Sequence, residues 1–137
     1  MLPVACVAPQ QAPPPANPFL GSWASEDKSQ ITFREDTVVL GPAEGGAAYD
    51  NTRCRGVFGF LYGKKSRDAL AALITRQPDL RKKVTDLLPQ PDYRVAELDC
   101  DQGDHTYVLL GDRDLLAIYR DGDIAGIDRL SRAGAGG

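Results

Sequence analysis

The sequence predicts a single mainly β domain, an antiparallel sheet into which two short helices are inserted. Along most of the chain, short segments that alternate apolar and polar residues are separated by turn residues. Only between residues 66 and 88 does the apolar spacing become that of a helix. Near the C-terminus, Asp121-Gly122 is a dipeptide typical of tight hairpins. With 137 residues, 42% of them hydrophobic, the chain is large enough for one domain with one core.

The expected strands fall on both sides of the helical region. Residues 93–100 alternate so that Leu98 and Cys100 point to the same face. A glycine- and alanine-rich loop is expected over residues 44–48, and a polar link over residues 102–106. The last three strands are expected to form an antiparallel meander. The expected strands are 30–34, 37–40, 57–62, 93–100, 107–110, 115–119 and 124–130.

Two helices, and not one long helix, are expected between Ser66 and Leu88. Ser66 is a good N-cap because its hydroxyl can accept a hydrogen bond from the first turn, and Asp68 complements the helix dipole. Pro78 ends the first helix and begins the second, since proline fits the first helical turn. The expected apolar stripes are Leu70, Leu73 and Ile74 in the first helix, and Leu80, Val84, Leu87 and Leu88 in the second.

The first twenty residues predict the remnant of an export signal followed by a tether. Leu2-Pro3-Val4-Ala5-Cys6 resembles the end of a bacterial lipoprotein signal peptide, in which small residues precede a cysteine that receives a lipid. The resemblance implies that residues 1–5 are residual signal peptide and that Cys6 is the lipidation site. Residues 6–20 contain five prolines among small and polar residues, which favours an extended tether. The alternatives are a disordered N-terminus with an incidental cysteine and a proline-rich partner motif.

The segment from Gly21 to Arg132 resembles a calycin, the class of lipocalin-type barrels. The resemblance rests on Gly21-Ser22-Trp23, on the number of short strands and on a basic residue in the last strand. It implies a small lipocalin-like barrel or half-barrel in which Trp23 packs beneath Arg132, or beneath Arg129 if the register differs. The alternative is an α+β fold with a curved antiparallel sheet packed on the helices. Residues 21–132 are then one globular domain and residues 133–137 a disordered tail.

The three cysteines suit an exported lipoprotein. With Cys6 lipidated, Cys54 and Cys100 remain, and both lie in strand-like segments. In an oxidising periplasm a disulfide between them closes a loop of about 45 residues and contributes on the order of 4 kcal/mol in the chain-entropy model. The alternative is a pair of buried free thiols in a cytosolic protein.

The formal net charge of −3 conceals a basic segment. Between Lys64 and Lys83, seven basic residues face two acidic ones, so this segment carries +5 and the rest of the chain −8. Such a patch suggests contact with an anionic envelope component or a protein, and the alternative is a solvated helix face. An acidic chain without a stacking array of aromatic residues does not indicate nucleic acid. The candidate patch consists of Lys64, Lys65, Arg67, Arg81, Lys82 and Lys83.

The sequence predicts no enzyme, no metal site and no cofactor. Its single histidine, His105, lies beside Asp104, but adjacent residues on a strand point to opposite faces. The aspartate-rich turns lack the ligand spacing of an EF-hand, and neither a Cys-x-x-Cys motif nor a phosphate-binding loop is present.

The expected function is therefore that of a non-catalytic lipoprotein of the bacterial envelope. A lipid anchor would hold it at the outer membrane facing the periplasm, where its domain would bind an envelope protein or act as a scaffold. The alternatives are an inhibitor of envelope proteases or lysozymes and a carrier of a small apolar ligand. Nothing in the residues predicts the oligomeric state.

Overall fold

The computed structural model describes residues 17–26, 29–41, 46–50, 60–100, 103–122 and 124–132. Two helices, α1 (Arg67–Ala71) and α2 (Pro78–Leu87), lie between the fifth and sixth strands. The strands within these ranges are β1 (Gly21–Ser25), β2 (Gln30–Phe33), β3 (Thr37–Leu40), β4 (Ala47–Asp50), β5 (Phe60–Ser66), β6 (Asp92–Cys100), β7 (Gly103–Leu109), β8 (Asp114–Asp121) and β9 (Ile124–Arg132).

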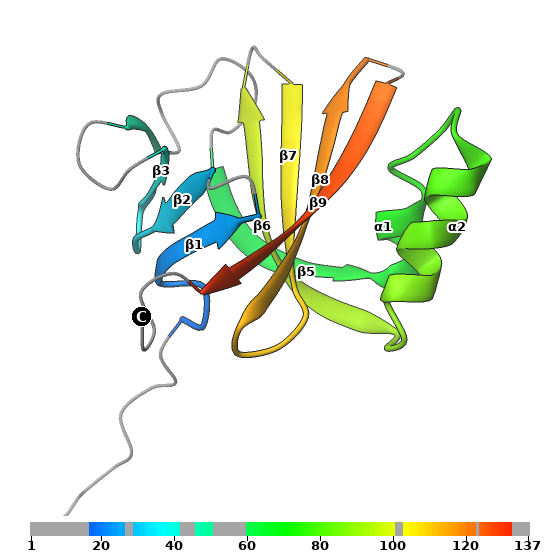
Figure 1. Ribbon diagram of the computed structural model, residues 1–137, viewed down its shortest axis with the longest axis horizontal. Helices are drawn as coiled ribbons and strands as arrows, with labels where there is room; N and C mark the ends of the chain where they lie inside the picture. Colours follow the sequence, from blue (N-terminus) through cyan, green and yellow to red (C-terminus); the bar gives the residue numbers. More distant parts are fainter. Residues whose placement is uncertain are drawn as a thin grey trace, which may run out of the picture.

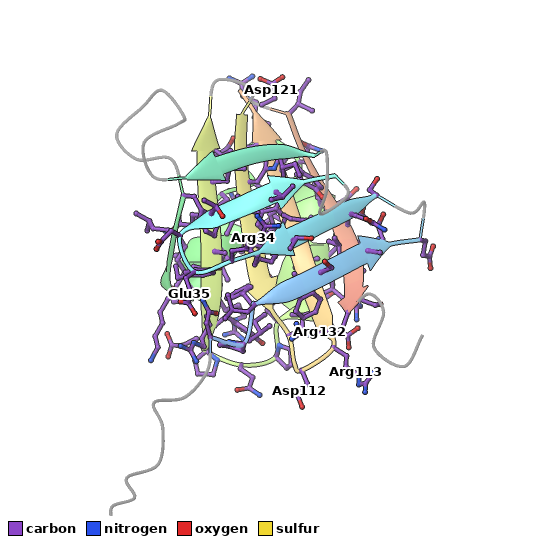
Figure 2. The ribbon with its side chains drawn as sticks, turned by 90° about the vertical axis from the view of Figure 1, so that its left-hand side faces the viewer. Arg34, Glu35, Asp112, Arg113, Asp121 and Arg132 are labelled. Carbon is purple, nitrogen blue, oxygen red and sulfur yellow. The ribbon has the colours of Figure 1, made fainter. Side chains whose placement is uncertain are left out.

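The nine described strands form one antiparallel sheet in the order β4-β3-β2-β1-β9-β8-β7-β6-β5. The sheet curls into a nearly closed barrel whose edges are β4 and β5 (Figure 1). Figure 2 shows β1 to β4 crossing in front of the strands of the other half. The predicted mainly β fold, an antiparallel barrel with two inserted helices, is thus confirmed.

Strands β6 to β8 are buried on both faces, because the barrel interior covers one and the helices cover the other (Figure 1). Apolar residues therefore occupy both alternation phases of these strands. The interior cluster consists of Phe19, Trp23, Ile31, Phe33, Val38, Phe60, Ala96, Leu98, Tyr107, Leu115, Ala117 and Leu130. The cluster beneath the helices consists of Leu70, Ile74, Val84, Leu88, Tyr93, Val95, Val108, Leu116 and Ile118.

Two helices lie where the sequence predicts them, but Pro78 does not end the first one, because α1 ends earlier, at Ala71. Ser66 is the N-cap of α1, and its hydroxyl accepts a hydrogen bond from the Ala69 N–H at 3.1 Å. Pro78 is the first residue of α2. Leu70 of α1 and Val84 of α2 are fully buried against the outer face of the sheet, as are Ile74 and Leu88, which follow the two helices.

The predicted tight turn joins β8 to β9. Asp121 pairs with Ile124, and Gly122 has a positive φ of 65°, which glycine adopts without strain. Gly122 is therefore the first residue of the turn, and Asp121 is the last residue of its strand. The hairpin turn therefore lies where the sequence predicts it, but it begins one residue later, at Gly122 instead of Asp121.

Two segments expected to be irregular belong to strands. Ala47 and Ala48, expected in a loop, begin β4 and pair with β3, and residues 103–106, expected in a polar link, form the first part of β7. The reason is tertiary: the backbone of β3 and of β6 offers a hydrogen-bonding partner that small or polar residues accept as readily as apolar ones. Of the expected strand at 57–62, residues 57–59 lie outside the described residues.

We expect Leu88→Ala to lower the free energy of unfolding by about 2–5 kcal/mol, because it opens a cavity between α2 and the sheet. Leu88 is fully buried, whereas Leu61 is 40% exposed. Leu61→Ala therefore serves as the matched control and should cost about 1 kcal/mol or less. Chemical denaturation followed by circular dichroism measures both values, and equal losses would contradict the placement of α2 on the sheet.

Candidate functional site

One end of the barrel is closed by the stacking of Arg132 on Trp23. The register of β1 on β9 sets these two residues opposite each other, and the guanidinium carbon lies 4.0 Å from the centre of the indole ring. Trp23 is fully buried, and its Nε1–H donates to the carbonyl of Phe19 at 2.9 Å. The structure thus brings together the two residues that the calycin resemblance assigns to barrel closure.

Arg132 also ties two chain segments to the barrel end. Its guanidinium donates to the carbonyls of Pro18 at 2.8 Å and Leu20 at 2.7 Å, and to the carbonyl of Asp112 at 3.1 Å. Residues 17–20 are therefore joined to the turn between β7 and β8 (Figure 2). Of the two candidate arginines, the register of β1 on β9 places Arg132, and not Arg129, opposite Trp23.

Gly21 allows this closure. Its φ is 114°, and a Cβ built there would lie 3.2 Å from Nη1 of Arg132. A larger residue would meet both backbone strain and the guanidinium group. In the Gly21-Ser22-Trp23 segment the glycine thus leaves room for the Arg132 guanidinium, and the tryptophan supplies the ring on which it stacks.

A chain of aromatic rings packs in the barrel interior. Phe33 lies 5.3 Å from both Phe19 and Tyr107, and Phe60 lies 4.9 Å from Tyr62, measured between ring centroids. These separations are typical of favourable aromatic pairs. The Tyr62 hydroxyl donates to the carbonyl of Arg34 at 2.7 Å, and burial raises the pKa of Tyr62 above its ordinary value.

His105 extends this aromatic chain, which the sequence did not indicate. On β7 its ring lies edge-on to Tyr119 at 5.0 Å, and its Nδ1 is 2.9 Å from the Tyr107 hydroxyl. Burial lowers the pKa of His105 below its ordinary value of 6.5, while the nearby Asp104 opposes that shift. Asp104 itself points away and pairs with Arg120 at 2.6 Å. The two neighbours therefore form no catalytic pair, and His105 serves the packing of the interior.

The six residues of the candidate basic patch occupy different surroundings. Lys65 lies 3.7 Å from Glu97, and Lys82 lies 3.1 Å from Asp86. Arg67 lies 3.7 Å from Asp68, and Arg81 Nε donates to the carbonyl of Ile74 at 2.9 Å. Lys64 is exposed on β5, opposite Arg94 on β6. Lys83 lines a groove on another part of the surface.

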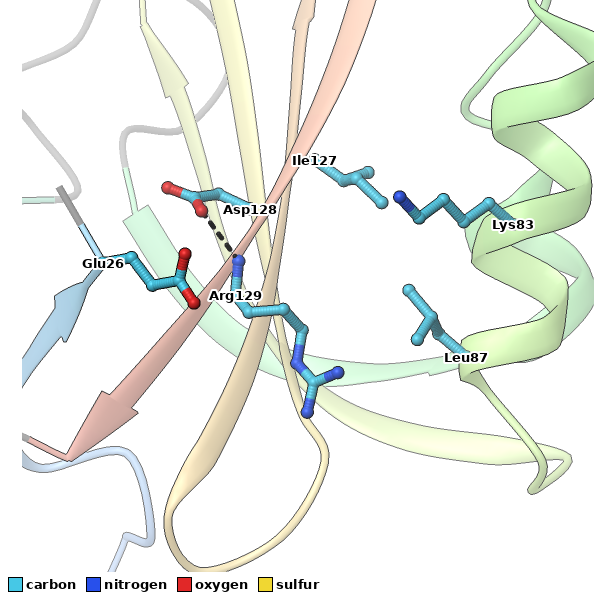
Figure 3. Close-up of a pocket in the computed structure, with 6 residues that line it drawn as sticks. All are labelled: Glu26, Lys83, Leu87, Ile127, Asp128 and Arg129. Atoms are coloured by element: carbon cyan, nitrogen blue, oxygen red, sulfur yellow. Dashed lines mark hydrogen bonds between the residues drawn. The ribbon is translucent and has the colours of Figure 1, made fainter.

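This groove, which we call the α2–β9 groove, lies between α2 and β9 and has a volume of about 370 Å³ (Figure 3). Lys83 and Leu87 reach it from α2. The remaining lining residues are Glu26, which follows β1, and Ile127, Asp128 and Arg129 of β9. The sequence missed the groove, because only the tertiary structure places residues 26, 83 and 127 together.

The described residues include only one of the three cysteines, Cys100. Cys6 and Cys54 lie outside the described residues, and Cys100 is described only as the last residue of β6. The lipidation of Cys6 and the disulfide between Cys54 and Cys100 stay predictions.

Arg132→Lys should lower the free energy of unfolding by about 2 kcal/mol or more. An ammonium group cannot replace a planar fork that stacks on indole while it donates to three carbonyls. Arg129→Lys is the control, since Arg129 is exposed and, among the described residues, its side chain makes one ion pair, at 4.0 Å with Asp114. Denaturation followed by the fluorescence of Trp23, the only tryptophan, measures both variants. A loss of similar size for both would contradict this role of Arg132.

His105 should make the protein less stable in mild acid. Because the folded state lowers its pKa, the unfolded state binds the proton more readily, and stability falls as pH drops below about 6.5. His105→Phe keeps a ring beside Tyr119 and removes the titration. We expect the unfolding free energy of the wild type to fall more steeply than that of the variant between about pH 7.5 and pH 5. Parallel pH profiles would rule out a contribution from His105.

Comparison with protein-family models, with curated proteins and with solved structures finds no match for this chain. In the part of the chain that the structure describes, no group of three or more His, Cys, Asp or Glu residues is placed to hold a metal ion. No helix among the same residues is both long enough and apolar enough to cross a membrane.

Proposed function

We propose that this protein is a non-catalytic, lipid-anchored lipoprotein of the bacterial envelope whose domain binds another protein. The lipid would be carried by Cys6, and ten residues separate that cysteine from Asn17, where the described chain begins. The proline-rich composition of these ten residues favours a tether, and all of them lie outside the described residues. Arg132 holds residues 17–20 at one end of the barrel, so this end would face the membrane.

The observation that carries the protein-binding proposal is the position of the α2–β9 groove on the outer face of the barrel, between α2 and β9. The groove combines apolar Leu87 and Ile127 with charged residues of both signs. A concave surface of this mixed character suits a polypeptide better than a small apolar molecule.

The two alternative functions receive less support. A carrier of an apolar ligand needs room inside the barrel, where Phe33, Tyr107 and Trp23 are packed with almost no exposure. An inhibitor of proteases through the proline-rich segment would need residues that precede Asn17, and these lie outside the described residues.

One experiment tests anchoring and protein binding together. The full chain, preceded by a complete signal peptide, is expressed in a Gram-negative host with an apolar photoreactive amino acid in place of Leu87, in the groove. We expect the membrane fraction to contain a form whose intact mass includes a lipid on Cys6 and rises by about 2 Da on reduction of one disulfide. Irradiation should join this form to a defined envelope protein.

Cys6→Ala is the control for anchoring and should leave the protein in the soluble periplasmic fraction. A photoreactive residue at position 64, exposed on β5, is the control for the cross-link. An unacylated protein with three free thiols would overturn the location, and equal cross-linking from both positions would overturn the use of the groove.

A further inference from the structure

Along much of its length, strand β9 has a strand neighbour on one side only, which is β8. It pairs with β8 throughout, but with β1 only from Leu130 to Arg132. β1 ends at Ser25, opposite Leu130, and no other described strand pairs with β9 between Ile124 and Arg129. Such an edge presents backbone N–H and C=O groups that a further strand can bind.

The side chain of Gln77 identifies the backbone groups that face this edge. Gln77 Nε2 donates to the carbonyl of Ala125 at 3.1 Å, and the Ala125 N–H donates to Gln77 Oε1 at 2.8 Å. The amide thus takes the place of a residue on a neighbouring strand. Because backbone direction alternates along a strand, the N–H and C=O groups of Ile127 and Arg129 point the same way as those of Ala125.

Ile127 lies between Ala125, whose N–H and C=O are both bound by Gln77, and Arg129, whose N–H alone is bound. The Arg129 N–H donates to Oδ1 of Asp128 at 2.9 Å, as the dashed line in Figure 3 shows. Neither the N–H nor the C=O of Ile127 has a partner on the open side among the described residues. The edge is therefore protected by Gln77 at one point and by Asp128 at another, and it is open at Ile127.

The α2–β9 groove follows this open edge. Figure 3 shows Glu26 and Asp128 on one side of β9, and Lys83 and Leu87 of α2 on the other. A strand lying along the edge would point its successive side chains alternately to these two sides. One side of the groove is acidic, and the other places an apolar surface beside basic groups.

The basic side has a free cation. Lys83 has no ion-pair partner among the described residues, whereas its neighbour Lys82 lies 3.1 Å from Asp86. Arg129 lies 4.0 Å from Asp114 and is half exposed. Leu87 and Ile127 supply the apolar surface on this side of the groove. A ligand complementary to this side of the groove therefore carries an apolar side chain flanked by carboxylates.

We propose that the α2–β9 groove binds an extended segment of a partner protein as an added strand on β9, an inference that rests on the proposed protein-binding function. The segment forms backbone hydrogen bonds with Ile127. On the side of α2 it carries carboxylates around an apolar side chain, which meet Lys83, Arg129 and Leu87. On the opposite side it carries basic side chains, which meet Glu26 and Asp128.

A displayed library of short random linear peptides, selected on the purified full chain, tests this proposal. We expect the enriched peptides to carry acidic and apolar residues at alternate positions, with basic residues at the positions between them. Lys83→Glu should weaken the binding of a selected peptide about tenfold or more, because it places like charges together. Lys82→Glu makes the same charge change one residue away, outside the groove, and should leave the affinity unchanged. Circular dichroism verifies that both variants are folded.

The backbone contact has its own measurement. Binding of a selected peptide should slow hydrogen exchange at the Ile127 amide. Methylation of the peptide nitrogen that faces Ile127 should abolish binding, because it removes the donor of a backbone hydrogen bond. The proposal is overturned if no peptide is enriched over the Lys83→Glu protein, if the two lysine variants bind alike, or if exchange at Ile127 does not change. A specific cross-link from position 87 in the envelope, obtained alongside any of these results, would leave the protein-binding function standing and remove only strand addition.

Discussion

The stacking of Arg132 on Trp23 is the contact on which the rest of the structure depends. Arg132 lies at the end of the last strand and Trp23 in the first, so their contact joins the two ends of the described chain across the β1–β9 pairing. The same guanidinium binds the carbonyls of residues 18 and 20 and of the β7–β8 turn. One side chain thus fixes the register of β1 on β9 and closes that end of the barrel.

The short reach of β1 has a second consequence, because it leaves β9 unpaired beyond Leu130. The helices between β5 and β6 pack on the outer face of β6 to β8 and place α2 beside this unpaired stretch. The short pairing of β1 with β9 therefore accounts both for the Arg132–Trp23 contact at the end of β9 and for the unpaired stretch further along that strand. The buried apolar cluster inside stabilises the barrel, and the proposed recognition surface lies outside it.

Much of the fold could be predicted from local signals. The helix start at Pro78, the cap at Ser66 and the glycine turn before Ile124 each depend on the chemistry of one or two residues. The double burial of β6 to β8 was less visible, because continuous apolar segments do not reveal what covers each face. Strand β4 and the start of β7 were missed, since their strand character comes from their neighbours and not from their own residues.

The sequence by itself determined the fold class and the presence of two helices between residues 66 and 88, and the calycin resemblance indicated that Trp23 packs beneath a basic residue of the last strand. Only the tertiary structure decided that this residue is Arg132, that His105 lies among the interior aromatic rings, and that Lys83 faces Ile127 across a groove. The physical reason is the range of each interaction. Propensity, capping and alternation act within a few residues, whereas register, burial and the composition of a groove depend on segments that folding brings together from distant parts of the chain.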